Sequence, residues 1–287
     1  MLLRMRDVEI TGITTVADDA GKRAGYAKRI LKLAGREDIP LKAGADVSGG
    51  YYRYRPEYPN DVDYWGERIP SLPNPPDEAL ELLKESIEHG ATIIGIGQYT
   101  NFALLEKKYP GSLRKADLYL MGGYLHPIRP GLPQLGNDMD YNIQLDIASA
   151  QYVLENAHLT LVPIAMGLET ALRRSALASL AQAGALGGLI VRQAEAFATE
   201  NKHEETYGKT CVHVPADAIN FQYDPLACAI AVGWREGVMI EELPLTFEIR
   251  DDLLHETIGK GGKPTNVVRT VDGERFNEFW HATLLRQ

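Results

Sequence analysis

The apolar positions of the chain follow two alternating patterns. Short runs of Val, Ile, Leu and Ala are typical of buried strands, and longer segments with apolar residues every three or four positions are typical of amphipathic helices. The predicted strands span 8–16, 39–46, 91–97, 116–123 and 159–166. The predicted helices span 20–35, 76–90, 100–109, 147–156, 168–201 and 224–234.

The C-terminal part departs from this alternation. Residues 238–250 and 266–273 are predicted as β structure, and a helix near 274–285 closes the chain. Two long loops, 47–76 and 124–138, are rich in Pro and Gly. Strands alternating with helices predict an α/β fold with a Rossmann-like, mostly parallel sheet and helices on both faces. We expect one domain over 1–287.

Polar residues that follow strands are the candidates for a site, because ligands of open parallel sheets bind beyond the carboxyl ends of the strands. Carboxylate and amide side chains gather in these positions. They are Asp18, Asp19, Asn101, Asn137, Asp138, Asp140, Asn142 and, before a late apolar helix, Asp224. Their oxygens suit Ca²⁺ or Mg²⁺, or the hydroxyl groups of a sugar.

The composition of the chain disfavours several classes of binding partner. The net charge of -9 disfavours nucleic acid and anionic membranes, which reward clustered Lys and Arg. The two cysteines, Cys211 and Cys228, form neither a disulfide framework nor a CxxC pair, which favours the cytoplasm. No apolar run approaches the roughly 20 residues of a membrane helix, and no signal-peptide pattern opens the sequence.

Each candidate also has a purely structural interpretation, and at this point both remain open. Asp224 precedes Pro225 and suits a helix N-cap, and Asp18 or Asp19 suits the cap of the next helix. Asn142 suits a turn. His126 suits a surface loop, and Tyr141 and Tyr223 suit aromatic packing.

Five motifs in order carry a resemblance to a known family. They are "VEITGITTVADD", "IGIGQYTN", "LYLMGG", "DYNIQLDIASAQYVLEN" and "QYDPLACA". The second is similar to a Gly-Pro-Leu-Thr-Asn turn, the third to a Met-Gly-Gly strand end, and the fourth to a Glu-Phe-Asn segment. The last is similar to a His-Asp-Pro helix start. Together they resemble the inosine–uridine preferring nucleoside hydrolase family.

The resemblance implies a homodimeric or homotetrameric hydrolase that cleaves the N-glycosidic bond of ribonucleosides with a Ca²⁺-activated water. It implies the main-chain carbonyl of Ile96 and the carboxylate of Asp224 as metal ligands. The implied substrate-binding residues are Asp19, Met121, Asn137, Asp140 and Asn142. Such cleavage develops oxocarbenium character at the ribose, and metal-bound water is a suitable nucleophile.

The first departure from the family is the absence of its opening motif, Asp-x-Asp-x-Gly-x-Asp-Asp. That motif ends the family's first strand and supplies the catalytic base and most metal carboxylates, so we expect the first strand to be missing here. Two explanations stay open: a start codon placed too late, which we favour, or a shortened and inactive chain. In both cases the chain from Met1 is expected to bind Ca²⁺ poorly, because few oxygen ligands remain.

The second departure is Tyr223, which stands where the family has His. A tyrosine, with an ordinary pKa of about 10, is a weaker acid than histidine near neutral pH. The hypothesis is that Tyr223 contacts the leaving base and that His126 is a substitute acid.

Two other functions stay open. One is a catalytically inactive relative that binds ribosyl compounds or serves as a structural subunit, which the missing acids favour. The other is a hydrolase for another ribosylated compound, whose pocket is shaped by the tyrosines of the loop 47–76. These rings could equally be buried against a neighbouring subunit. They are Tyr51, Tyr52, Tyr54, Tyr58 and Tyr64.

Overall fold

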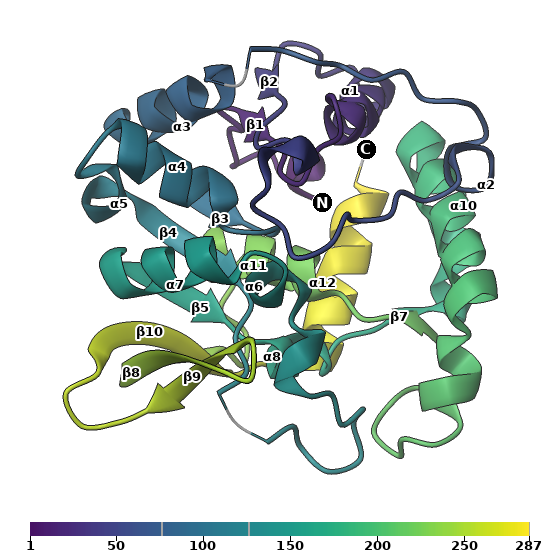
Figure 1. Cartoon of the computed structure of the whole chain (residues 1–287). Helices are drawn as coiled ribbons and strands as arrows, with labels where there is room; N and C mark the ends of the chain where they lie inside the picture. Colours follow the sequence, from purple (N-terminus) through teal and green to yellow (C-terminus); the bar gives the residue numbers. More distant parts are fainter. Residues whose placement is uncertain (76, 126, 287) are drawn as a thin grey trace.

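The computed structural model describes residues 1–75, 77–125 and 127–286 (Figure 1). The strands are β1 (Ile13–Thr14), β2 (Leu41–Lys42), β3 (Thr92–Gly95), β4 (Asp117–Met121), β5 (Leu159–Val162), β6 (Leu172–Arg173), β7 (Ala218–Asn220), β8 (Met239–Arg250), β9 (Leu253–Ile258) and β10 (Lys263–Thr270). The longer helices are α1 (Lys22–Ala34), α3 (Glu78–Glu88), α4 (Thr100–Lys108), α7 (Ile147–Asn156), α10 (Gly184–Asn201), α11 (Tyr223–Ala231) and α12 (Gly273–Leu285). The short helices include α2 (Asp61–Trp65), α5 (Ser112–Lys115), α6 (Tyr141–Gln144), α8 (Ile164–Gly167), α9 (Leu177–Leu180), η3 (Asn137–Met139) and the π-helical turn η5 (Glu204–Gly208).

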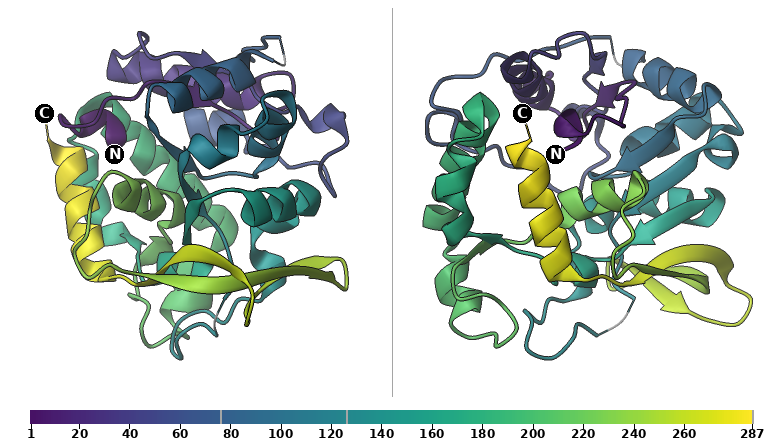
Figure 2. Two further views of the ribbon diagram at one scale, coloured as in Figure 1. Left: turned by 90° about the vertical axis from the view of Figure 1, so that its left-hand side faces the viewer. Right: turned by 180° about the vertical axis from the view of Figure 1, so that it is seen from behind.

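The central sheet has the strand order β3-β4-β5-β10-β8-β9. Neighbouring strands from β3 to β10 are parallel, whereas β10, β8 and β9 are antiparallel. Leu118 pairs with Leu159, and Leu120 with Leu161, so the middle of the sheet is apolar. The predicted α/β fold with a mostly parallel sheet is confirmed, and β8 and β9 form a long hairpin at its edge (Figure 2).

Helices cover both faces of this sheet. One buried cluster joins it to α3, α4 and α7, with Leu105 and Leu154 fully buried. A second cluster joins it to α8, α11 and α12, with Leu226 and Phe276 fully buried. Among the described residues, no helix is both long and apolar enough to cross a membrane.

Several predicted elements were wrong in extent. The strands predicted at 8–16 and 39–46 keep two residues each, because β1 and β2 pair only with one another. The strand predicted at 159–166 ends at Val162, where Pro163 leads into α8. The helix predicted at 168–201 is divided into β6, α9 and α10, and β9 lies in a segment for which no strand was predicted.

The sheet is also divided. β1 and β2 form a separate two-stranded sheet, and β3 is the edge of the six-stranded one. The two sheets are linked by the side chain of Asn101, at the start of α4. Its amide nitrogen donates to the carbonyl of Thr15 at 2.7 Å, and its oxygen accepts from the amide of Ala45 at 2.8 Å. Asn101 is 5% exposed, so these contacts replace water for both backbone groups.

We expect Asn101→Ala to lower the free energy of unfolding by about 2 kcal/mol or more, because it leaves one buried backbone carbonyl and one buried amide without partners. Urea unfolding measures this loss. Asn156→Ala is the matched control, since Asn156 is exposed and bonds only the carbonyl of Tyr152 one turn earlier in α7. Equal stability of the two variants would contradict the linking role of Asn101.

Candidate active site

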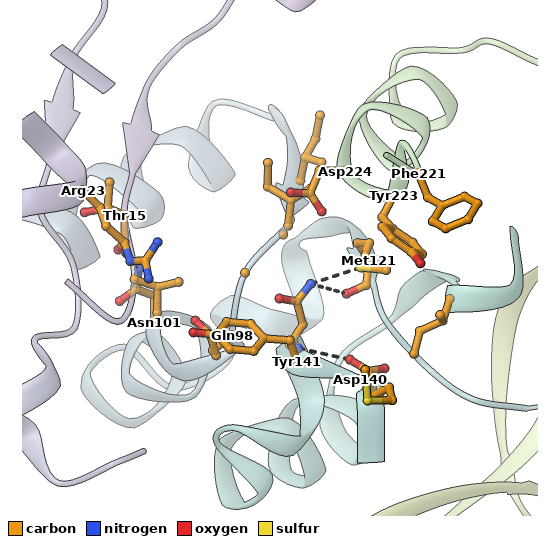
Figure 3. A pocket seen from close by; sticks show the side chains of 18 of the residues that line it. Thr15, Arg23, Gln98, Asn101, Met121, Asp140, Tyr141, Phe221, Tyr223 and Asp224 are labelled. Atoms are coloured by element: carbon orange, nitrogen blue, oxygen red, sulfur yellow. Dashed lines mark hydrogen bonds between the residues drawn. The ribbon is translucent and has the colours of Figure 1, made fainter. Parts of the chain in front are cut away.

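A cleft of about 620 Å³ opens at the carboxyl ends of β3 and β4 (Figure 3). The residues after β1 and β3 form one side of it, and the start of α11 contributes Tyr223 and Asp224. Met121 at the end of β4, together with residues 139–142, forms another side. The cleft therefore lies where the sheet is divided, at the strand ends that the sequence indicated.

Asp140 joins the end of β4 to the start of α6. Its Oδ1 accepts the amides of Asn142 and Ile143, both at 3.1 Å, and thereby caps α6. Its Oδ2 accepts the amide of Gly123 at 2.5 Å. Asp140 is 2% exposed, and burial raises its pKa to about 6. Its carboxyl therefore binds three backbone amides, and Asp140 also lines the cleft.

Asn142 is held against the strand end beside it. Its amide nitrogen donates to the carbonyl and to the Sδ of Met121, both at 3.1 Å. Its side-chain oxygen makes no hydrogen bond within the described part of the chain. Since Asn142 and Met121 both line the cleft, this pair offers a fixed hydrogen-bonding edge to a bound molecule.

Asp224 is the acid that the fold leaves available. It lies in the first turn of α11, but Gln222 is the N-cap residue, so the interpretation of Asp224 as the cap is wrong. Within residues 1–75, 77–125 and 127–286 its carboxylate makes no hydrogen bond or ion pair. Burial raises its pKa to about 7. Ile96, the other expected metal ligand, also lines the cleft and is half-exposed.

An aromatic wall lines the cleft on the side of Tyr223. Phe221, Tyr207 and His203 belong to it, and His203 lies 5.0 Å from Tyr207 and 5.7 Å from Phe221 between ring centroids. Burial raises the pKa of Tyr223 and lowers that of His203, so both are neutral near pH 7. The ring of Tyr223 lies directly over Gly167, where a Cβ atom would come within 2.0 Å of it.

Sequence reasoning missed His203 and Tyr207. His203 is the N-cap residue of η5 and Tyr207 lies within η5, and no motif marks this segment. The short π-helical turn could not be recognised from the pattern of apolar residues. The observed π-helical turn itself indicates a functional site, because such turns are frequent at functional sites.

Two of the expected residues that the structure describes, Asp19 and Asn137, are not brought to the cleft. Asp19 forms an ion pair with Arg55 on the surface. The side chain of Asn137 donates to the carbonyl of Leu254 at 2.5 Å and accepts from Gln144 at 3.1 Å, so it anchors η3 to β9. His126 lies outside the described residues.

Three of the five tyrosines of 47–76 show two kinds of contact. Tyr52 and Tyr58 pack within the chain: the hydroxyl of Tyr52 accepts from the amide of Ala17, and that of Tyr58 from the amide of Asp19. Tyr54 is 56% exposed, and its ring meets that of Tyr141 at 6.4 Å. Because Tyr141 lines the cleft, the loop reaches its rim.

The described residues do not fit a calcium site. They contain no group of three or more Asp, Glu, His or Cys side chains placed to share a metal ion. The carboxyl of Asp18 accepts the amides of Arg23 and Ala24 at 2.6 and 3.0 Å and so caps α1. Asp224 and the carbonyl of Ile96 alone fall short of the six to eight oxygens that Ca²⁺ takes.

Comparison with known proteins identifies the class of this fold. It is similar to a plant nucleoside hydrolase, the PpNRh1 enzyme, with a TM-score of 0.76, 20% identity, and coverage of 100% of this chain and 93% of the other. It is also similar to the purine-preferring ribonucleoside hydrolase from Gardnerella vaginalis, with a TM-score of 0.75, 18% identity, and coverage of 99% and 92%. The architecture is thus that of the nucleoside hydrolases.

The family follows from the sequence match. A family profile described as "Inosine-uridine preferring nucleoside hydrolase" matches residues 1–278, and the chain belongs to this family. An uncharacterised protein of Schizosaccharomyces pombe is 27% identical over 170 residues, which are 56% of this chain and 52% of that protein. The match therefore spans about half the length of that curated relative.

We expect calorimetric titration of the 287-residue chain with Ca²⁺ to detect no tight binding, because a single unpaired carboxylate and one carbonyl supply too few ligands. Asp224→Asn serves as the control, and its heat trace should match that of the wild type. A tight site that this substitution abolishes would contradict the prediction.

Proposed function

We propose that the cleft binds a ribonucleoside and that the chain is a nucleoside N-ribohydrolase, which releases the base and ribose. The observation that carries this proposal is the combination of an unpaired, mostly enclosed carboxylate, Asp224, with an aromatic wall in one cavity. A nucleoside has the matching halves, a polyhydroxyl sugar and a flat base. Membership of the family supports the same assignment.

The ribose fits the side formed by Asp224, Asn142 and Met121. The free side-chain oxygen of Asn142 and the carboxylate of Asp224 are acceptors for sugar hydroxyls. The cleavage develops positive charge at the ribose, and an ionised carboxylate that faces the sugar stabilises that charge more strongly in an enclosed site than in water.

The base fits the aromatic wall. Rings of Tyr223, Tyr207 and Phe221 provide faces and edges on which a flat base can stack, and stacking tolerates different bases. His203 adds a neutral imidazole, which offers one donor and one acceptor to the base. A binding pocket for another ribosylated compound remains compatible with this wall.

Hydrolysis by a Ca²⁺-activated water, which the family resemblance implies, needs more oxygen ligands than the described residues supply. No step of the proposed mechanism therefore passes through the metal. The same shortage favours a second candidate function, a ribosyl-binding relative without catalysis. A homodimer or homotetramer stays a prediction.

A panel of purine and pyrimidine nucleosides separates the two functions. Release of free base, followed by chromatography, supports the hydrolase, whereas calorimetric binding without release supports the binding protein. Neither binding nor release by any nucleoside would reject both.

We expect Asp224→Asn to weaken nucleoside binding or cleavage by about 10-fold or more, because it removes a charge-assisted hydrogen bond worth about 1.5–3 kcal/mol while keeping the shape of the side chain. Asp138→Asn is the matched control, since Asp138 is exposed and lies outside the cleft. Identical constants for the two variants would remove Asp224 from the site.

The aromatic wall gives a prediction about Tyr223. Tyr223→Phe keeps the stacking ring and should leave nucleoside affinity within about twofold, whereas Tyr223→Ala should weaken it about 5-fold or more, as stacking on a base is worth about 1–3 kcal/mol. Calorimetry measures both. If Tyr223→Phe and His126→Ala each leave kcat unchanged, neither residue is the acid for the leaving base.

A further inference from the structure

Two buried carboxyl groups bind consecutive amides of the turn that follows β4. Gly123 donates its amide to Oδ2 of Asp140 at 2.5 Å, and Tyr124 donates its amide to Oε2 of Glu256 at 3.2 Å. Asp140 comes from the start of α6, and Glu256 comes from the middle of β9. The turn therefore brings together two acids that are distant in the sequence.

Among the described residues, no cation forms an ion pair with either carboxyl. Asp140 and Glu256 are 2% and 4% exposed. Lys263 lies on the same face of the sheet, across β8, but its amino nitrogen is buried without any hydrogen-bond partner. Tyr99, another titratable group near the two acids, donates a hydrogen bond from its hydroxyl to the carbonyl of Met121 at 3.0 Å.

Two uncompensated carboxylates cannot both stay ionised in such a position, because burial and mutual repulsion each disfavour the charged form. The hydrogen bonds decide which group keeps the proton. Asp140 accepts three amides, whereas Glu256 accepts one from another residue, and its Oε1 is buried with no partner among the described residues. Amide donors favour the ionised form, so the proton belongs on Glu256.

The pKa values agree with this assignment. Burial raises the pKa of Asp140 to about 6. Burial, followed by the charge of Asp140, raises the pKa of Glu256 to about 8. Near pH 7 the pair therefore carries one negative charge, on Asp140.

We propose that Glu256 is a positioning residue of the cleft, which carries a proton and leaves the negative charge on Asp140. The ionised Asp140 keeps its three amides, and these fix the strand end with Met121 and the helix start with Asn142. Loss of the proton from Glu256 places a second negative charge beside the turn that follows β4. This charge loosens both the strand end with Met121 and the helix start with Asn142. The effect on the nucleoside rests on the proposed function, whereas the protonation of Glu256 does not.

The first test is the pH dependence of stability. The folded chain holds a proton on Glu256 that the unfolded chain, with a pKa of 4.5, releases, so stability falls as the pH rises from about 4.5 to about 8. Glu256→Gln removes this fall. The unfolding constant of the wild type, divided by that of Glu256→Gln, should rise at least about 10-fold between about pH 5 and pH 8.

Glu242→Gln is the matched control, because Glu242 is exposed on the neighbouring strand β8 and its substitution should leave the ratio constant. A ratio for Glu256→Gln that stays as flat as that of the control would overturn the proposal. If Glu256→Gln does not fold, infrared difference spectra of Asp224→Asn, which lacks the other buried carboxyl with a pKa of about 7, decide instead. The carbonyl band of a protonated carboxylic acid should be present at pH 7 and disappear near pH 9, and its absence at pH 7 rejects the protonated Glu256.

The second test measures how nucleoside binding in the cleft depends on pH. The KM or Kd of the wild type for a nucleoside should rise several-fold above about pH 8, with a smaller change in kcat, and Glu256→Gln should abolish that rise. An unchanged pH profile in Glu256→Gln would reject the positioning role even if the stability test succeeds. If the wild type neither binds nor cleaves nucleosides, the proposed function fails, and the stability test still decides the state of Glu256.

Discussion

Three backbone amides converge on the carboxyl of Asp140, and this contact joins the end of β4 to the start of α6. It requires a tight approach at Gly122, whose φ is +144° and where a Cβ atom would lie 2.6 Å from the hydroxyl of Tyr99. Met121 and Asn142 flank the contact and bond to one another. The shape of this side of the cleft thus depends on which backbone amides donate to the buried carboxylate of Asp140.

The other acids that follow strands differ in what their carboxyls bind. Asp18 is occupied in capping α1, and Asp19 is paired with Arg55. A carboxylate that accepts backbone amides gains its stabilisation from them and has less to offer a ligand. Asp224 lacks such partners within the described residues, and this distinguishes it from the rest. The nucleoside hydrolase fold is therefore present with a polar and an aromatic side to its cleft, and among the described residues that line the cleft Asp224 is the acid without a hydrogen-bond partner.

The pattern of the sequence predicted those elements that depend on local periodicity. The strands near 92–95 and 117–121 and the helices α1, α3, α4 and α7 lie within about two residues of the prediction, and α11 ends three residues before its predicted end. The prediction failed where the extent of a strand depends on its pairing partner. β1 and β2 are short because they pair with one another, and β9 forms because it pairs with β8 in an antiparallel hairpin. Ile96, Met121, Asp140, Asn142, Tyr223 and Asp224 do line one cleft, whereas Asp19 and Asn137 do not.

The sequence by itself determined the α/β class and the family, because apolar periodicity and the order of short motifs are local properties that survive without coordinates. Only the tertiary structure decided which carboxyl groups accept hydrogen bonds from backbone amides and which remain available to a ligand. It also decided that His203 and Tyr207 face the cleft and that Glu256 lies beside Asp140. These properties arise from burial, hydrogen bonds and charges supplied by distant segments, which no short stretch of sequence contains.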